Sequence, residues 1–196
     1  MNDQMVLVVG GPGGSGSSTI AKRLAKYFNI KRIYGGEYFR KEAKSRGFDS
    51  LEAFYERAKK EDIKKIDQRV DNHFRDLAKK GGVLIESKIF SGIATKEKIS
   101  CTSKIWITAS LDVRVERVLG KEKIRGFLRK WFRRREIIND LTKRYEYDKE
   151  RYHDLYGIDY DSPNKYNDLV IDSSHQVPDE TFSLIINFLN NGKGEE

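Results

Sequence analysis

The chain has 196 residues, of which 38% are hydrophobic and 35% charged, with a formal net charge of +8 and one cysteine. This length predicts a single domain with a proper core, and the lone cysteine excludes an intramolecular disulfide. No apolar run approaches the roughly 20 residues that span a bilayer, and no signal peptide precedes the first predicted strand, so we expect a cytoplasmic protein.

Residues 5–20 read MVLVVGGPGGSGSSTI and predict a strand, a glycine-rich loop and a helix in succession. Met5 to Val9 is a short apolar run typical of a buried parallel strand, whereas Ile20, Leu24 and Phe28 share one helix face. Glycine leaves backbone amides free to converge on phosphate oxygens, and the helix N-terminus adds partial positive charge. The context therefore predicts a phosphate-binding loop.

From Gly11 to Ser18 the loop follows the pattern G-x-x-x-x-G-K-[ST], with Ser17 in place of the lysine. Ser18 occupies the position whose hydroxyl coordinates Mg²⁺. A charge ~4 Å from a phosphate oxygen is worth roughly 4 kcal/mol at an intermediate dielectric, so the loop could bind nucleotide yet catalyse poorly. Lys22 points elsewhere on the helix and is a poor substitute. The residues expected to bind ATP are Gly11, Gly13, Gly14, Ser15, Gly16, Ser17, Ser18 and Thr19.

Further along the chain, short apolar runs alternate with helical patterns. The predicted strands are 5–9, 31–34, 83–85, 104–108 and 169–171. Helices are expected from Glu37, over 51–59, 63–80 and 111–119, as one or two helices in a basic segment, and from Pro178. This alternation predicts an α/β fold with a five-stranded parallel sheet, helices on both faces and ligand at the carboxyl ends of the strands. We expect one domain over 1–190 and a polar tail over 191–196.

The excess positive charge is concentrated between Lys121 and Arg151, where twelve lysines and arginines face six acids. A local cationic segment suits polyphosphate as well as RNA. Within it, Arg144, Asp148 and Arg151 lie at i, i+4 and i+7 and so share one helix face. The plainer interpretation of this spacing is a surface ion pair.

Several segments, in this order, resemble the nucleoside monophosphate kinases, and most closely the shorter cytidylate kinases. They are GGEYFR (35–40), IDQRVD (66–71), LIESK (84–88), LDVRVER (111–117), KRYEYDKERYHDLYGID (143–159) and NDLVIDSS (167–174). The resemblance covers nearly the whole chain. It implies a three-layer P-loop NTPase fold with acceptor-binding helices at about 36–80 and a basic helical lid at about 121–156.

The same resemblance implies an ATP:CMP phosphotransferase that uses Mg²⁺, with Ser18 as a ligand of the metal. Arg144 and Arg151 would clamp the transferring phosphoryl group, while Asp148 orients them or reads the nucleotide. Arg117 would stack on the donor adenine. The residues implied to bind the acceptor are Gly36, Arg40, Asp67, Asp71 and Lys88.

The role of Asp67 and Asp71 has an open alternative, and Lys88 departs from the family's residue. Asp67 and Asp71 share a helix face, and a carboxylate there could accept a hydrogen bond from the cytosine 4-amino group, which would favour CMP over UMP. The alternative is a solvated helix face. Lys88 stands where the family has arginine, so it keeps the charge and loses the bidentate geometry.

Phosphoryl transfer to a monophosphate needs no strong general base, because the acceptor is already an anion; it needs positioning and charge stabilisation. The expected partners are ATP, CMP and dCMP, with no membrane and a monomeric chain. Three alternatives stay open: a nucleotide-binding relative with little kinase activity, a kinase of the same fold for another acceptor, and an RNA-binding module. The basic segment could supply a cation in place of the missing lysine.

Overall fold

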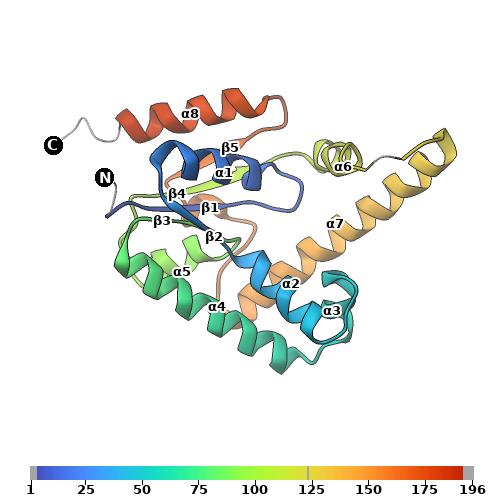
Figure 1. The fold of residues 1–196 in the computed structure, drawn as a ribbon, viewed down its shortest axis with the longest axis horizontal. Coiled ribbons are helices and arrows are strands. Elements are labelled where there is room, and N and C mark those ends of the chain that lie inside the picture. Colours follow the sequence, from blue (N-terminus) through green and yellow to red (C-terminus); the bar gives the residue numbers. More distant parts are fainter. Residues whose placement is uncertain (1–3, 123, 192–196) are drawn as a thin grey trace.

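The computed structural model describes residues 4–122 and 124–191, apart from the side chain of Glu52 (Figure 1). Its centre is a five-stranded parallel sheet, as the sequence predicts, and the strand order is β2-β3-β1-β4-β5. The strands are β1 (Val6–Gly10), β2 (Lys31–Tyr34), β3 (Val83–Glu86), β4 (Ser103–Thr108) and β5 (Leu169–Asp172).

The register of the sheet aligns the carboxyl ends of neighbouring strands. In β1, Val9 pairs with Glu86 of β3, and Gly10 pairs with Trp106 of β4. The carboxyl ends of the strands therefore form one edge, and the loop that follows Gly10 leaves from the middle of that edge. This is where open α/β sheets bind ligands.

Eight α-helices and one 3₁₀ helix connect the strands within the described residues. They are α1 (Ser17–Phe28), α2 (Gly35–Ser45), α3 (Leu51–Arg57), α4 (Lys60–Lys80), α5 (Phe90–Lys96), α6 (Leu111–Leu119), α7 (Phe127–Tyr156), η1 (Pro163–Lys165) and α8 (Pro178–Asn191). The helices expected over 51–59 and 63–80 are confirmed with boundaries shifted by two or three residues. The sequence analysis did not predict α5 or η1.

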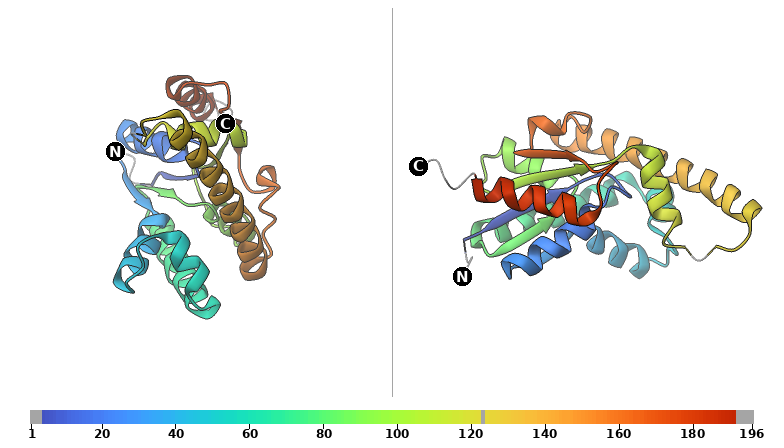
Figure 2. Two further views of the ribbon diagram at one scale, coloured as in Figure 1. Left: turned by 90° about the vertical axis from the view of Figure 1, so that its right-hand side faces the viewer. Right: turned by 90° about the horizontal axis from the view of Figure 1, so that it is seen from above.

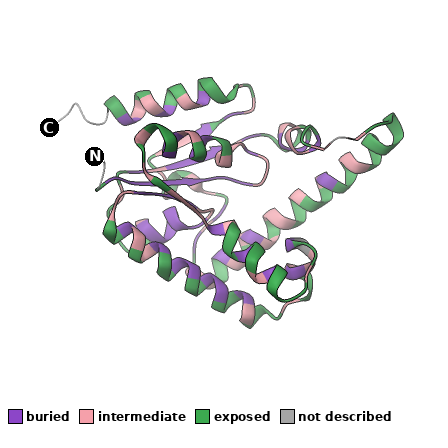
Figure 3. Cartoon of the chain, in the orientation of Figure 1, coloured by how far each residue is buried: buried purple, intermediate pink, exposed green. Residues whose placement is uncertain are grey.

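The two faces of the sheet carry separate cores. Val6 and Val8 of β1 point to the face covered by α2 to α5, whereas Leu7 and Val9 point to the face covered by α1 and α8. Figure 2 shows these layers from two sides, and Figure 3 shows that the buried residues lie mainly on the strands and on helix surfaces that face them. Three layers of this kind confirm the expected fold class.

From Phe127 onward the basic segment forms one helix, α7, of 30 residues. Its first half projects beyond the sheet and packs on α6 through Ile137, whereas its second half returns to the edge of the sheet (Figure 1). The N-terminal end of α7 carries the large, exposed apolar side chains of Phe127, Leu128 and Phe132.

At the other end of the chain, α8 extends to Asn191, so that residue belongs to a helix and not to a polar tail. The remainder of the predicted tail, 192–196, lies outside the described residues. Within 4–122 and 124–191, we find no helix that combines the length and hydrophobicity needed to cross a membrane.

Candidate active site

The glycine-rich loop between β1 and α1 has the backbone that phosphate binding requires. Gly14 and Gly16 have φ values of 83° and 97°, which side chains rarely allow. The helix α1 begins at Ser17, and no side chain among the described residues caps its N-terminus at Gly16. The Ser17 amide donates to the Ser15 hydroxyl at 3.4 Å, and the helix dipole favours an anion at this end of α1.

A hydroxyl group and a carboxylate meet at the start of α1. The Ser18 hydroxyl donates a hydrogen bond to the Glu86 carboxylate, and Arg32 Nε donates to the second Glu86 oxygen at 2.6 Å. Glu86 is 4% exposed and is the last residue of β3, beside the phosphate loop. Sequence reasoning assigned Glu86 no role, although the carboxyl end of a strand next to β1 is a position where a functional carboxylate could be sought.

The pair Ser18 and Glu86 suits Mg²⁺, because hard oxygen ligands are what this ion binds. Among the described residues, no group of three or more histidine, cysteine or acidic side chains could hold a metal by itself. Mg²⁺ usually keeps one or two protein ligands and completes its shell with substrate phosphates and water.

A cleft of about 420 Å³ opens between the loop, α2, α4, the end of β3 and α7. The structure brings nearly all of the predicted site residues to its walls, and only Ser15 and Arg117 are missing from the lining. Those that line the cleft are Gly11, Gly13, Gly14, Gly16, Ser17, Ser18, Thr19, Gly36, Arg40, Asp67, Asp71, Lys88, Arg144, Asp148 and Arg151.

The two residues outside the lining have structural contacts instead. Ser15 is 1% exposed, and its hydroxyl accepts a hydrogen bond from the Ser17 amide at 3.4 Å. Arg117 Nη1 donates to the Ser15 carbonyl at 2.9 Å, and Arg117 Nη2 donates to the Ser173 carbonyl at 2.7 Å. Arg117 therefore ties the phosphate loop to the segment after β5.

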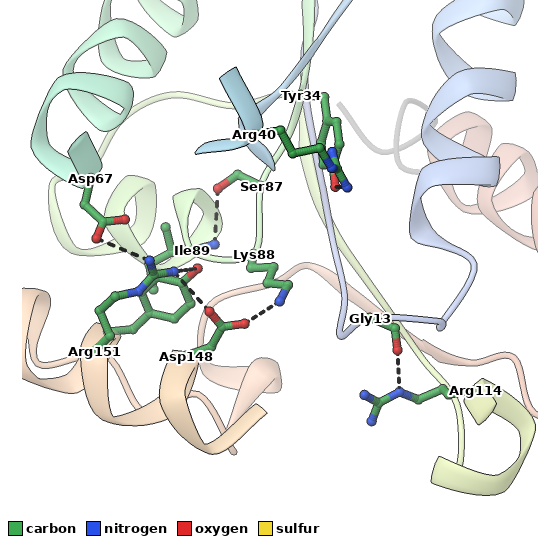
Figure 4. A network of polar contacts seen from close by, with 11 residues as sticks. Gly13, Tyr34, Arg40, Asp67, Ser87, Lys88, Ile89, Arg114, Asp148 and Arg151 are labelled. Atoms are coloured by element: carbon green, nitrogen blue, oxygen red, sulfur yellow. Dashed lines mark hydrogen bonds and ion pairs between the residues drawn. The ribbon is translucent and has the colours of Figure 1, made fainter. Parts of the chain in front are cut away.

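A second arginine of α6 also contacts the loop. Arg114 Nε donates to the Gly13 carbonyl at 2.7 Å (Figure 4). The sequence analysis included Arg114 in a segment of resemblance but assigned it no role. Its contact depends on how α6 packs against the loop, which a linear sequence does not express.

At the opposite end of the cleft, one carboxylate is shared by two cations. Asp148 of α7 is 1% exposed, and it accepts hydrogen bonds from Lys88 and, at 3.0 Å, from Arg151 Nη2 (Figure 4). Burial alone would raise the pKa of Asp148, but Lys88 and Arg151 outweigh it and hold that pKa below its usual value. Burial lowers the pKa of Lys88 to about 8, against the attraction of Asp148.

Arg151 is enclosed by aromatic rings. Its guanidinium carbon lies 4.7–5.4 Å from the ring centres of Phe39, Tyr55, Tyr147 and Tyr152. Its Nε and Nη1 atoms are buried without a hydrogen-bond acceptor, although Nη1 lies 3.5 Å from Asp67 Oδ2. Such buried donors are costly unless an acceptor reaches them, and a phosphate oxygen entering the cleft would supply one.

The acceptor side of the cleft also holds two carboxyl groups and one arginine. Burial raises the pKa of Asp67 to about 7 and that of Asp71 to about 6, and Asp71 accepts a hydrogen bond from the Tyr156 hydroxyl. Arg40 lies against Tyr34, with its guanidinium carbon 5.1 Å from the ring centre and Nη2 donating to the hydroxyl at 3.2 Å. Asp67 and Asp71 are therefore buried groups, not members of a solvated helix face.

Two further arginines of α7 are engaged by neighbouring carboxylates. Arg133, which also lines the cleft, pairs with Glu122 and Glu136, and Arg134 pairs with Asp112 and Glu116 of α6. The basic segment is thus a helix fastened to α6 by ion pairs, and its cationic surface is smaller than the sequence count suggests.

Comparisons with known proteins agree with this geometry. A family model described as "AAA domain" matches residues 9–128. The cytidylate kinase of Methanopyrus kandleri is 37% identical, with 92% of this chain and 91% of the relative covered, and the cytidylate kinase of Methanocaldococcus jannaschii is 32% identical, with 96% and 99% covered.

Among solved structures, an uncharacterized protein from Eubacterium ventriosum has a TM-score of 0.66 at 20% identity and covers 95% of this chain and 98% of its own. Shikimate kinase from Bacteroides thetaiotaomicron has a TM-score of 0.60 at 12% identity with the same coverage. At these identities the structural likeness supports the fold alone.

Proposed function

The chain belongs to the cytidylate kinase family and is a phosphotransferase, and we propose that it moves the γ-phosphoryl group of ATP to CMP, and to dCMP, within its 420 Å³ cleft. The observation that carries the proposal is that two sets of anion-binding groups line one cleft. The phosphate-loop residues Gly13, Gly14 and Gly16 to Thr19 form one set, and Arg40 with Lys88 forms the other. Two anions held across one cleft are what this reaction needs.

The donor triphosphate would lie in the loop, with its terminal phosphates at the N-terminus of α1. Mg²⁺ would be held by Ser18 together with Glu86, and when bound it neutralises charge on the donor phosphate oxygens. Arg32, by its bond to Glu86, keeps that carboxylate turned toward the loop.

The acceptor monophosphate would be bound by Arg40 and Lys88, because these two cations line the cleft outside the phosphate loop. Lys88 is oriented by its ion pair with Asp148. The cytosine ring would lie toward Asp67 and Asp71 on α4, where a carboxylate can accept a hydrogen bond from the 4-amino group. Uracil offers an acceptor at that position and would be disfavoured.

Between the two substrates, Arg144 and Arg151 would stabilise the transferring phosphoryl group. Both lie on the half of α7 that reaches the cleft, and guanidinium groups match phosphate oxygens bidentately. The attacking oxygen is already anionic, so no general base is required. Packing of α7 close to the loop, with Leu141 near Gly13, would exclude water and limit hydrolysis of ATP.

A coupled assay of ADP release tests the proposal directly. The native chain is given ATP, Mg²⁺ and in turn CMP, dCMP, UMP, AMP and GMP, each over a range of concentrations. We expect the highest kcat/KM with CMP, a measurable value with dCMP and much lower values with the other three. Preference for a purine monophosphate would contradict the placement of the cytosine beside Asp67. The relatives favour this function over a pseudokinase or an RNA-binding module.

A further inference from the structure

Two arginines on one face of α6 contact the phosphate loop, although neither side chain belongs to the cleft lining. Arg114 Nε donates to the carbonyl of Gly13 at 2.7 Å, and Arg117 Nη1 donates to the carbonyl of Ser15 at 2.9 Å. The helix is packed tightly against the loop, because a Cβ placed on Gly14 would lie 2.9 Å from the Arg114 carbonyl oxygen. The loop and α6 therefore form one unit.

Neither arginine is neutralised by a carboxylate among the described residues. The acids of α6, Asp112 and Glu116, pair instead with Arg134 of α7. Arg114 is only 8% exposed, and a buried guanidinium without a counter-charge costs free energy. An arginine in that state beside an anion-binding loop is stabilised when the anion arrives.

The position of Arg114 relative to the cleft supports this interpretation. Val118, one turn further along α6, lines the cleft, as does Lys121 just beyond the helix. The same side of α6 thus forms part of the cleft wall. The Arg114 side chain lies beside Gly13, to whose carbonyl its Nε donates (Figure 4). Among the described residues we find no hydrogen-bond acceptor for its two terminal amino groups.

Three other cations that line the cleft are each paired with carboxylates. Lys88 is paired with Asp148, Arg151 is held by Asp148 and Asp67, and Arg133 is paired with two glutamates. Each of these charges is partly cancelled before a nucleotide binds. The positive charge of Arg114 is not cancelled in this way.

We propose that Arg114 supplies to the donor triphosphate the positive charge that a lysine at position 17 would supply, and that Arg117 fixes the loop in the matching position. The inference rests on the proposed function, since it presumes that the loop binds ATP. The cation that replaces the missing lysine would then come from α6 and not, as expected from the sequence, from the basic segment. An arginine supplied in cis can stabilise phosphate charge as a separate part of the site.

The test separates charge from tethering by two substitutions. Arg114→Gln keeps a donor for the Gly13 carbonyl and removes the charge, whereas Arg114→Lys keeps the charge and changes the donor. Affinities for a non-hydrolysable ATP analogue and for ADP, both with Mg²⁺, are measured by calorimetry. Arg23→Gln is the matched control, because Arg23 pairs with Asp179 of α8 and not with the loop. Lys121→Gln serves as the competing candidate, because Lys121 also lines the cleft.

We expect Arg114→Gln to weaken binding of the ATP analogue about 30-fold or more and binding of ADP much less, because the missing charge acts mainly on the outer phosphates. Arg114→Lys should stay within about fivefold of the native chain, and Arg23→Gln should match it. Equal effects of Gln and Lys at position 114, equal losses for the two nucleotides, or a larger loss in Lys121→Gln would overturn the proposal.

A second measurement covers the case in which Arg114→Gln lowers the melting temperature. The double variant Ser17→Lys, Arg114→Gln should then regain binding of the ATP analogue, because the lysine restores the charge without restoring the contact with Gly13. If the double variant binds no better than Arg114→Gln alone, the role of Arg114 is structural. Failure of the native chain to bind the ATP analogue at all would instead reject the proposed function.

Discussion

Lys88 and Asp148 lie 60 positions apart in the chain and form an ion pair at the acceptor end of the cleft. Because Asp148 also accepts a hydrogen bond from Arg151, one carboxylate fixes a cation on each side of itself. The arrangement joins the segment after β3 to α7, so the acceptor wall and the lid helix are oriented by the same buried group.

Removing that carboxylate should damage both stability and activity. We predict that Asp148→Asn lowers the free energy of unfolding by about 3–5 kcal/mol, because Lys88 and Arg151 would lose the buried carboxylate that they share, which leaves Arg151 with Asp67 alone. Denaturant unfolding measures the loss. Asp154→Asn is the control, since the side chain of Asp154 is 77% exposed. A loss no larger than that of the control would mean that Asp148 does not hold the two cations.

Activity should fall at high pH through Lys88. The pKa of Lys88 is lowered to about 8, so the ammonium is charged below pH 8 and loses its proton above it. The KM for CMP should therefore rise as pH increases from 7 to 9, with little change in the KM for ATP. In Lys88→Arg the basic limb should disappear from this range, because arginine stays protonated. A limb that persists unchanged in Lys88→Arg would assign the titration to another group.

The two lid arginines should differ when they are removed. We predict that Arg144→Ala and Arg151→Ala each lower kcat about 100-fold or more, as loss of a donor to transition-state charge does. Arg151→Ala should in addition lower the melting temperature clearly, because the Arg151 side chain is 8% exposed and stacks among four aromatic rings. Steady-state kinetics and thermal unfolding provide the two readouts. An unchanged kcat in both variants would remove these residues from the transfer step.

Glu86 should determine the requirement for Mg²⁺. We expect Glu86→Gln to lower kcat about 100-fold and to raise the Mg²⁺ concentration needed for half-maximal activity, because the amide is a weaker ligand beside Ser18. Titration of activity with MgCl₂ at fixed ATP measures both. Glu97→Gln, whose glutamate pairs with Arg75 away from the cleft, should resemble the native chain. An unaltered Mg²⁺ dependence in Glu86→Gln would indicate that Glu86 only positions Arg32.

Much of the fold could be predicted because its signals are local. Each strand is a short apolar run, and the glycine-rich loop is identified by its own residues. The five strands and their parallel orientation are therefore recovered from the sequence. The helix α5 has no such signal, because seven residues are too few for a 3.6-residue period to stand out.

The candidate site was predictable where a single segment defines it and not where packing does. Arg144, Asp148 and Arg151 share a helix face and line the cleft together. Glu86 belongs to the site because the register of the sheet pairs it with Val9, next to the phosphate loop. Likewise, the contact of Arg114 with Gly13 spans 101 positions and depends on the angle at which α6 meets the loop. Neither relation has a signature in the linear sequence.

The central claim is that a phosphate loop with Ser17 in place of lysine still supports phosphoryl transfer to CMP. Phosphorus NMR of the native chain with ATP, CMP and Mg²⁺ tests this most directly, with Ser17→Lys run in parallel. We predict that the signals of CDP and ADP appear together and in equal amounts in the native reaction. If CDP forms only with Ser17→Lys, or if ADP and inorganic phosphate accumulate without CDP, the claim is contradicted.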